Sequence, residues 1–589
     1  MSGRRRTLYG LLVPMRDGTQ LSLDVVQPDD DPPHPVVLIR TMYDKVAQRD
    51  GVDDPARGIP YDRRFVEALL DAGYALAVQD VRGRFDSDGE WHPYMHERRD
   101  GFDTVEWINE QPWCDGNIGM IGRSYVGYTQ WRAAADRPRG LKAIVPISPQ
   151  ADLYNGYPII NGVFLLAMGE LGIKGGRHSF QIGNFMANVM KGPEPYFDTL
   201  PISRMFEAAG VTEPPWWTAM MDHPNRDDYW RAGEYAEAWP AIEVPALGIT
   251  GWYDLVVEGA IANFEGMTAH AEDESARAGQ ELIVGPWAHW VNVRTDLNGV
   301  DFGRDSLIDL QGCIIGFFDR WMKQSGGEPP AKRVRIFVMG ANEWWEADAW
   351  PLPEAQERRL FLHGDGTPGE FNGGGCLSFQ PPGDEPPDEY TYDPLHPVTS
   401  AWSMHAGPID DRETATRPDV LTYVTEPLDE DIDVVGPLTL ELHAASSATD
   451  TDWHVRLVDV HPDARMNFIS HGVLRARFRE SFESPSLLEP GAVYSFRIPL
   501  TPTAMRFAAG HRIGLEITSS WFPRFERNMN SGAPNNFRDA DPHAATQTVM
   551  HDASAPSQLR LCVIPNGSYQ ASSFAARHLQ PMVGEGAST

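Results

Sequence analysis

The chain has 589 residues, of which 42% are hydrophobic, and its 50 basic and 83 acidic residues give a formal net charge of −33. This length predicts two or three domains, because a single hydrophobic core rarely grows beyond about 250–300 residues. The strong negative charge disfavours nucleic acid and anionic membranes as partners.

The amino-terminal segment "MSGRRRTLYGLLVPMRDGT" has three arginines but no apolar run of the length found in signal peptides. No stretch approaches the roughly 20 apolar residues of a membrane-spanning helix. We therefore expect a soluble, cytoplasmic protein without a membrane partner. Four cysteines lie far apart and lack CxxC spacing, which predicts neither a disulfide framework nor a zinc site: Cys114, Cys313, Cys376 and Cys562.

The first 147 residues predict alternating strands and helices. In "LSLDVVQP" apolar residues alternate with others after the turn signal "RDGT", which is typical of antiparallel strands. Beyond it, apolar runs such as "PVVLIR", "YALAVQD" and "LKAIVPI" alternate with helical stretches such as "RRFVEALLDAG". This alternation indicates an α/β domain with a mostly parallel sheet covered by helices.

Two further runs of this kind, "VPALGIT" and "ELIVGPW", come only after residue 243. We therefore expect the α/β domain to consist of residues 1–147 and 243–352, with residues 148–242 inserted as a helical cap. The insert contains helical patterns rich in Met and aromatic residues, including "SFQIGNFMANVM" and "DDYWRAGEYAEAW". Such an insert is placed to form a lid over a site at the strand ends, although core packing is the commoner role of its apolar residues.

Past about residue 352 the helical patterns stop. The segments "LTLELHA", "WHVRLVDV", "YSFRIPL" and "HRIGLEITS" alternate strictly, with Pro and Gly between them. Residues 353–589 are therefore predicted to form an antiparallel β sandwich or jelly roll.

The segment "MIGRSYVGYTQW", residues 120–131, combines a strand-like run, a turn and a plausible helix start. A strand, sharp turn and helix hold a serine hydroxyl exposed at the edge of the sheet, which makes Ser124 a candidate nucleophile. The second glycine, Gly127, stands three residues after the serine instead of the usual two, so the motif alone leaves an ordinary turn as an alternative.

A nucleophilic serine needs a base and an orienting acid, which in this fold follow it in the order Ser, Asp, His at later strand ends. Asp254 follows the strand "VPALGIT" in "GWYD", and His289 follows "ELIVGPW" in "AHW". Taken alone, Asp254 has the alternative of a helix N-cap and His289 that of a structural histidine. The order and the strand context of all three residues favour a catalytic triad.

Acyl transfer also needs hydrogen-bond donors aimed at the developing oxyanion. The backbone N–H of Tyr125 is one donor by position. A second is expected from the loop "TMYDK" after the strand "HPVVLIR", where Tyr43 carries a hydroxyl. A loop tyrosine on its own is more often a packing residue.

Several long segments resemble one family of serine hydrolases, which contains cocaine esterase and the X-prolyl dipeptidyl peptidases. They include "RTMYDK", "DVRGRFDSDGEW", "DGNIGMIGRSYVGYTQW", "GWYD", "GPWAHW" and "SSWFPRFERNMNSG". The resemblance spans nearly the whole chain and is closest to the cocaine esterase branch. It implies an α/β-hydrolase domain, an inserted helical cap and a C-terminal jelly roll.

In the family's motifs the nucleophile falls on Ser124, the acid on Asp254 and the base on His289. The tyrosine of the "YDK" motif, here Tyr43, donates its hydroxyl to the oxyanion beside the Tyr125 amide. The displaced glycine is part of the family's pattern. The resemblance thus implies a Ser-His-Asp acyl-enzyme mechanism that needs neither a metal nor an organic cofactor.

Members that hydrolyse α-amino acid esters carry an acidic residue three after the serine, where this chain has Gly127. Recognition of a free α-amino group is therefore not implied. The aromatic that cocaine esterase carries two residues after the acid is replaced by Val256. We predict a substrate pocket that includes Trp252, Val256, Trp287, Trp402 and Met404.

The sequence therefore predicts a carboxylesterase acting on a small-molecule ester, as a monomer or a homodimer. One alternative is an amidase or acylase, or an X-prolyl dipeptidyl peptidase, because the same triad serves esters and amides. Another, of a different class, is a non-catalytic ligand-binding protein that uses the jelly roll.

Overall fold

The computed structural model of the protein describes residues 5–51, 58–175, 194–323, 325, 329–366, 375–399 and 407–577. The chain divides into two compact units. The first comprises Met1–Ala151, Tyr235–Trp350 and the segment from Tyr569 onward, and the second comprises Asp152–Glu234 and Pro351–Ser568. The sequence predicted domain boundaries at 147/148, 242/243 and 352/353. The helix predicted around residues 179–190 lies outside the described residues.

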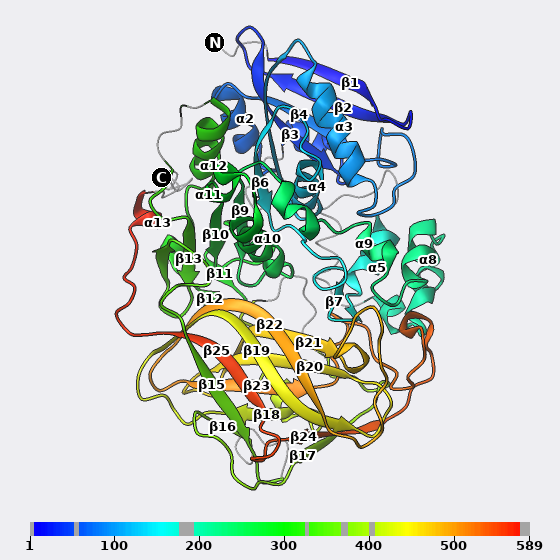
Figure 1. The fold of residues 1–589 in the computed structure, drawn as a ribbon, viewed down its shortest axis with the longest axis vertical. Helices are drawn as coiled ribbons and strands as arrows, with labels where there is room; N and C mark the ends of the chain where they lie inside the picture. Colours follow the sequence, from blue (N-terminus) through cyan, green and yellow to red (C-terminus); the bar gives the residue numbers. More distant parts are fainter. Residues whose placement is uncertain are drawn as a thin grey trace, which may run out of the picture. The chain divides into compact units, whose positions relative to one another are not determined.

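The first unit is built on a ten-stranded sheet (Figure 1). Its strands, in spatial order, are β1 (Arg6–Pro14), β2 (Gln20–Gln27), β4 (Ala75–Asp80), β3 (His34–Thr41), β5 (Cys114–Arg123), β6 (Leu141–Ile147), β9 (Leu247–Gly251), β10 (Glu281–Gly285), β13 (Val334–Val338) and β14 (Glu343–Ala347). The strands from β4 to β13 run parallel, while β1, β2 and β14 pair antiparallel. The parallel strands are buried almost throughout, as their continuous apolar runs predicted.

Helices cover both faces of this sheet. They are α1 (Lys45–Asp50), α2 (Arg63–Asp71), α3 (Glu97–Asn109), α4 (Tyr125–Ala134), α10 (Val257–His270), α11 (Glu274–Ala278), α12 (Leu310–Phe318) and the short α13 (Phe574–Arg577). Phe318 of α12 lies against Gly119 of β5, whereas Val126 of α4 lies against Gly122. Because successive residues of a strand face opposite sides, α4 and α12 pack on opposite faces of the sheet.

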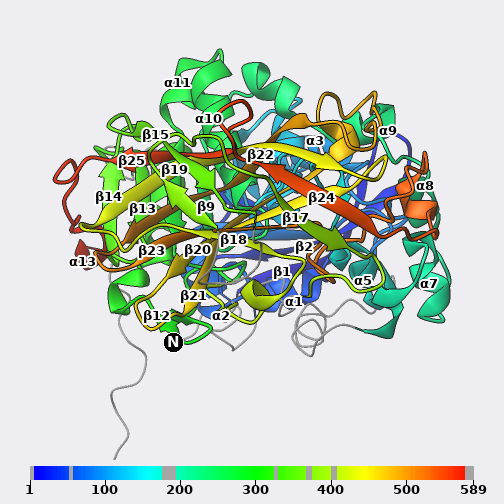
Figure 2. The ribbon, with the colours of Figure 1, turned by 90° about the horizontal axis from the view of Figure 1, so that it is seen from below.

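The second unit contains an eleven-stranded antiparallel-rich sheet, seen in Figure 1 and from below in Figure 2. Its strands are β15 (Gln356–His363), β16 (Cys376–Ser378), β17 (Asp388–Tyr392), β18 (Leu421–Val424), β19 (Ile432–Ser446), β20 (Asp452–Val460), β21 (Met466–Arg475), β22 (Tyr494–Phe507), β23 (Arg512–Thr518), β24 (Ala545–Met550) and β25 (Gln558–Ile564). Strand β25 pairs with both β15 and β19, so the sheet closes on itself. Closure leaves few exposed strand edges.

The inserted segment packs with this β domain in the second unit. Its elements include β7 (Ile159–Ile160), β8 (Val163–Phe164), α5 (Ala167–Lys174), α7 (Met205–Ala208), α8 (Pro215–Met221) and α9 (Asp228–Arg231). A backbone bridge joins Leu165 to Phe525, and the ring centroids of Phe164 and Phe537 are 5.6 Å apart. Trp217 is fully buried, as expected for a core role of the segment's aromatic residues.

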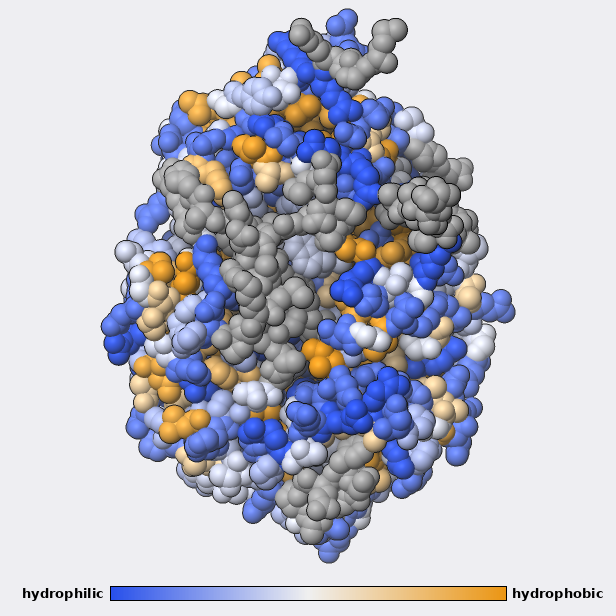
Figure 3. Space-filling view, turned by 180° about the vertical axis from the view of Figure 1, so that it is seen from behind, coloured by the Kyte–Doolittle hydropathy of each residue, from blue (hydrophilic) through white to orange (hydrophobic). Residues whose placement is uncertain are grey.

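Within the described residues, no helix combines the length and the apolar character needed to cross a membrane. Hydrophilic residues predominate on the face drawn in Figure 3, in keeping with the 23% of charged residues in the chain. All four cysteines are free thiols.

Candidate active site

Ser124 occupies the turn between β5 and α4 in the first unit. Its backbone has φ 62° and ψ −126°, a left-handed conformation that non-glycine residues rarely adopt. Its N–H donates to the carbonyl of Ile147 at 2.8 Å, and its own carbonyl accepts from Gly127 and Tyr128 at 2.7 and 3.0 Å. The turn is therefore strained and held by hydrogen bonds on both sides, as expected of a functional position.

The two glycines around Ser124 allow close packing of strand and helix. A Cβ on Gly122 would lie 2.0 Å from a methyl group of Val126, and one on Gly127 would lie 2.9 Å from the carbonyl oxygen of Ile147. Any side chain at either position would push α4 away from the sheet. The displaced glycine of the motif thus has a packing role in this chain.

Asp254 and His289 form a buried pair at the ends of β9 and β10. The His289 Nδ1 atom is 3.0 and 3.1 Å from the two Asp254 carboxylate oxygens. The Asp254 side chain is fully buried and that of His289 is 10% exposed. Since β9 and β10 are adjacent and parallel, two residues that follow them meet at the same edge of the sheet.

The Asp254 carboxylate is held in its ionised form. Burial acts to raise the pKa of Asp254, but the charge and hydrogen bond of His289 and further hydrogen bonds outweigh it, so the pKa lies below its usual value. Those further bonds come from the Ser148 hydroxyl and from the Val256 N–H, the latter at 3.0 Å. The bond from Val256 closes a turn before α10, but the N-cap of that helix is Val256, so Asp254 is not the helix N-cap that the sequence offered as an alternative.

Tyr43 reaches Ser124 from the loop after β3. Its hydroxyl is hydrogen-bonded to the Ser124 side chain and to the backbone N–H of Tyr125, and its side chain is buried. Burial raises the pKa of the phenol above its ordinary value, so the hydroxyl stays protonated at neutral pH. The structure thus brings together Ser124, Tyr43 and the Tyr125 amide, and separately pairs His289 with Asp254.

The loop that carries Tyr43 is fixed by buried polar contacts. The Tyr43 N–H donates to the Thr41 hydroxyl at 2.9 Å. Lys45 is buried and forms ion pairs with Asp80 at 3.4 Å and with Asp86. The lysine of the "YDK" motif therefore anchors the tyrosine that precedes it by two residues.

The Tyr125 side chain points into a different network. Its hydroxyl donates to Glu97 at 2.7 Å, and Glu97 is paired with Arg40 at 2.9 Å. Only the backbone of Tyr125 therefore faces Ser124.

Two neighbours of the site were not predicted from the sequence. Arg123 is 1% exposed, and its guanidinium carbon lies 3.7 Å from the ring centroid of Trp290 and 4.8 Å from that of Tyr61. Burial lowers the pKa of Arg123 to about 10, which still leaves a positive charge beside Ser124 at neutral pH. Ser148, the hydrogen-bond donor to Asp254, is the second neighbour. The sequence carries no local signal for either contact, because both partners come from distant segments.

The predicted pocket residues differ in their surroundings. Trp252 and Trp287 are each 2% exposed, and their indole N–H groups donate to the carbonyls of Phe337 at 2.7 Å and Ser306 at 3.0 Å. Val256 is buried at the start of α10. Trp402 and Met404 lie outside the described residues. The buried, hydrogen-bonded indoles favour a packing role for the two tryptophans, and their part in a pocket stays a prediction.

Comparison with known proteins places this chain in a family. Residues 17–291 match the model of the X-Pro dipeptidyl-peptidase (S15 family), and residues 329–560 match that of the X-Pro dipeptidyl-peptidase C-terminal non-catalytic domain. Cocaine esterase of Rhodococcus sp. (strain MB1 Bresler) is 36% identical over 566 residues, which cover 90% of this chain and 94% of that protein.

Two solved structures share the fold across both units. An α-amino acid ester hydrolase superposes with a TM-score of 0.82 at 27% identity, covering 95% of this chain and 97% of that chain. An aminopeptidase from a marine sediment archaeon, Thaumarchaeota archaeon, gives a TM-score of 0.79 at 25% identity, covering 95% of this chain and 96% of that chain. The expected α/β-hydrolase domain with an inserted helical segment and a C-terminal β domain is confirmed. The chain belongs to the family of serine hydrolases that contains cocaine esterase and the X-prolyl dipeptidyl peptidases.

Proposed function

We propose that this protein hydrolyses carboxylic esters of small molecules through an acyl-enzyme on Ser124. The observation that carries the proposal is the Tyr43 hydroxyl, which is hydrogen-bonded both to the Ser124 side chain and to the Tyr125 N–H. A nucleophile with two donors beside it is the arrangement that stabilises a tetrahedral oxyanion. The buried pair of His289 and Asp254 supplies a base with a fixed orientation.

In the first step His289 accepts the Ser124 proton through Nε2 while the serine oxygen attacks the ester carbonyl carbon. Asp254 holds Nδ1 in its protonated form and stabilises the imidazolium that results. His289 then donates the proton to the leaving alcohol, and the acyl group remains on Ser124. Water repeats the attack with the same base and releases the acid.

The oxyanion is stabilised by Tyr43 and by the Tyr125 amide. In the resting site the Tyr43 hydroxyl is hydrogen-bonded both to the Ser124 side chain and to the Tyr125 N–H. When the carbonyl oxygen becomes negative, the Tyr43 hydroxyl can rotate its hydrogen toward it. The Tyr125 N–H, whose direction is fixed by the backbone, exchanges the Tyr43 oxygen for the oxyanion as its acceptor. The raised pKa of Tyr43 keeps its proton available as a hydrogen-bond donor throughout the neutral range.

Esters are favoured over peptides as substrates by two observations. The relative that is 36% identical is an esterase by name, whereas the relatives named as Xaa-Pro dipeptidyl-peptidases are 21–22% identical. In addition, position 127 is a glycine with no volume for a side chain, so it offers no carboxylate to a substrate ammonium group. Amide or peptide cleavage is the second candidate function, because the same residues catalyse both reactions.

The test compares short-chain nitrophenyl esters with Xaa-Pro anilides as substrates of the purified protein and of its Ser124→Ala variant. We expect ester hydrolysis and fluorophosphonate labelling in the wild type and neither in the variant. A Ser306→Ala variant is a matched control, since Ser306 is a buried serine of the same unit whose hydroxyl bonds the Gly303 carbonyl at 2.7 Å.

Faster cleavage of the anilides would replace the esterase proposal with the peptidase one. Absence of labelling in a folded wild type would favour the non-catalytic alternative. Most of the activity surviving in Ser124→Ala would exclude Ser124 as the nucleophile.

A further inference from the structure

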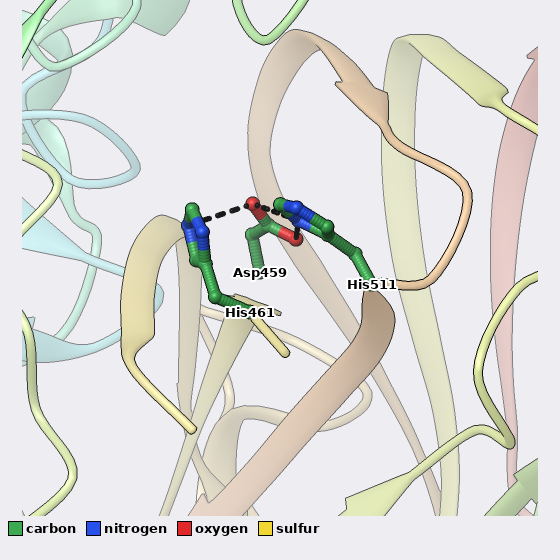
Figure 4. Close-up of side chains that lie close together, drawn as sticks. All are labelled: Asp459, His461 and His511. Carbon is green, nitrogen blue, oxygen red and sulfur yellow. Dashed lines mark hydrogen bonds and ion pairs between the residues drawn. The ribbon is translucent and has the colours of Figure 1, made fainter. Parts of the chain in front are cut away.

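Asp459, His461 and His511 come together in the second unit, whereas the proposed catalytic residues all belong to the first. Asp459 lies near the end of β20, His461 begins the turn to β21, and His511 immediately precedes β23. Strand β20 lies between the other two, with Asp459 opposite Asn467 on one side and Ile513 on the other. Figure 4 shows both imidazole rings turned toward the carboxylate between them.

The donor atoms have the spacing of a ligand set. His511 Nδ1 is 2.9 and 3.1 Å from the two Asp459 oxygens, and His461 Nε2 is 3.2 Å from one of them. One atom from each residue lies within 4.8 Å of the other two. A tetrahedral zinc ion with bonds of about 2.0–2.2 Å separates its ligand atoms by about 3.3–3.6 Å. Small side-chain shifts would therefore admit an ion.

The two histidines are held by ordered backbone. The His461 N–H donates to the Arg465 carbonyl and the Ala464 N–H to the His461 carbonyl, both at 2.9 Å, which closes the turn between β20 and β21. The His511 N–H donates to the Ala508 carbonyl at 3.0 Å. A ligand set built on fixed strand ends loses little conformational entropy when an ion binds.

The two arginines near the cluster have other partners, so neither neutralises the charge of the Asp459 carboxylate. Arg465 comes within 3.4 Å of His461 Nδ1, but it is paired with Asp463 at 2.8 Å. Arg512 bonds the Thr425 carbonyl and lies 3.6 Å from Glu426. The Asp459 side chain is only 3% exposed, and a buried carboxylate requires a cation or several hydrogen-bond donors.

Polar groups contact both ring nitrogens of His461. The Asn467 amide nitrogen is 2.8 Å from His461 Nε2, and Arg465 lies 3.4 Å from Nδ1 on the other side of the ring. The Nε2 atom also faces an Asp459 oxygen at 3.2 Å. An ion bound here would lie between His461 Nε2 and this oxygen and would replace the Asn467 contact, because a ring nitrogen offers one lone pair.

We propose that Asp459, His461 and His511 bind one divalent transition-metal ion of the zinc type, with water in the fourth position. Two imidazole nitrogens and a carboxylate oxygen suit zinc, cobalt and nickel, whereas calcium and magnesium prefer oxygen ligands throughout. The imidazole side chains are 19% and 20% exposed, which gives the ion and its water access from solvent. The ion links the turn after β20 to the turn before β23.

The test uses the full chain, stripped with a chelator and titrated with Zn²⁺ and with Co²⁺. We expect one ion per chain and the visible absorption of four-coordinate cobalt, which zinc then abolishes. The His461→Gln and His511→Gln variants should each bind zinc at least about 100-fold more weakly. His543→Gln is a matched control and should bind like the wild type, because His543 pairs with Asp541 at 3.0 Å but belongs to no such cluster among the described residues.

A measurement on the wild type keeps the test independent of how the variants fold. Zinc should raise the melting temperature and protect His461 and His511, but not His543, from diethyl pyrocarbonate, as read by peptide mass spectrometry. Equal zinc affinity in the wild type and in a folded His461→Gln/His511→Gln double variant would overturn the proposal. So would the absence of protection at saturating zinc, and the cluster would then be a metal-free set of hydrogen bonds.

Discussion

Removal of the Tyr43 hydroxyl separates the catalytic proposal from a structural role. In Tyr43→Phe the ring that packs in the core is kept, and only the oxygen bonded to Ser124 and to the Tyr125 N–H is lost. Loss of one of two oxyanion donors costs about 2.7–4 kcal/mol in the transition state, which is about a 100- to 1,000-fold fall in kcat. KM should change little, because the ground-state carbonyl is bound less strongly than the oxyanion.

The expected effect on folding is much smaller. The variant loses a buried hydroxyl whose net hydrogen-bond contribution is about 1 kcal/mol, and the Tyr125 amide loses an acceptor. A matched control is Tyr128→Phe. Tyr128 is buried on α4, the helix that begins with Tyr125, and its hydroxyl donates to the Tyr94 carbonyl at 3.0 Å. It should lose a similar amount of stability and almost no kcat.

The assay measures kcat and KM on a short-chain nitrophenyl ester, normalised to active sites titrated with a fluorophosphonate. The free energy of unfolding of the wild type and both variants comes from denaturant titration. The reasoning is refuted if Tyr43→Phe retains more than about a tenth of the wild-type kcat, or if its loss of activity follows its loss of stability as in Tyr128→Phe.

Three further outcomes follow from the structure. Asp254→Asn should keep its fold by circular dichroism but lower kcat by about 10⁴-fold, because the His289 tautomer is no longer fixed; retention of most of the activity would contradict this. Burial lowers the pKa of His454 to about 3 in the folded state, whereas in the unfolded chain it is about 6.5. Below about pH 6.5 the unfolded state therefore binds a proton that the folded state does not, and the free energy of unfolding falls. Between pH 7 and 5 this costs about 2 kcal/mol, which denaturant titration should detect and His454→Gln should remove; an equal loss in that variant would refute the assignment. Gly127→Glu should destabilise the fold and give no hydrolysis of α-amino acid esters, since its Cβ would meet the Ile147 carbonyl at 2.9 Å; a stable variant active on those esters would show that α4 can shift.

The order of the strands explains what could be predicted from the sequence. Each residue of the predicted triad follows an apolar run, and parallel strands bring their carboxyl ends to one edge of the sheet. Ser124, Asp254 and His289 could therefore be predicted from three local patterns. The contact of the Ser148 hydroxyl with Asp254 could not be predicted in this way, because it depends on β6 lying beside β9. At that point the Ser148 N–H donates to the Ile249 carbonyl at 2.7 Å.

Contacts between distant segments account for the other differences. Arg123 is buried between Tyr61 and Trp290, and no feature of the "GRSY" motif indicates those partners. The pattern of the inserted segment likewise does not reveal its partners within the second unit, where it packs with the β domain through pairs such as Leu165 and Phe525. Neighbouring residues of a pattern predict local structure, whereas burial of a charge or docking of a segment depends on residues far away in the chain.

Gly127 connects the packing of the site with the choice of substrate. Its Cβ position is bounded by the Ile147 carbonyl, the Pro149 side chain at 3.2 Å and the Gly122 carbonyl at 3.3 Å. A carboxylate for an ammonium group could therefore be placed at position 127 only by moving the first turn of α4. That turn also carries the Tyr125 amide, which is bonded to Tyr43 beside Ser124. A side chain at position 127 would therefore disturb the backbone that the proposed oxyanion site uses, and this is the physical basis of our proposal that the substrates lack an α-amino group.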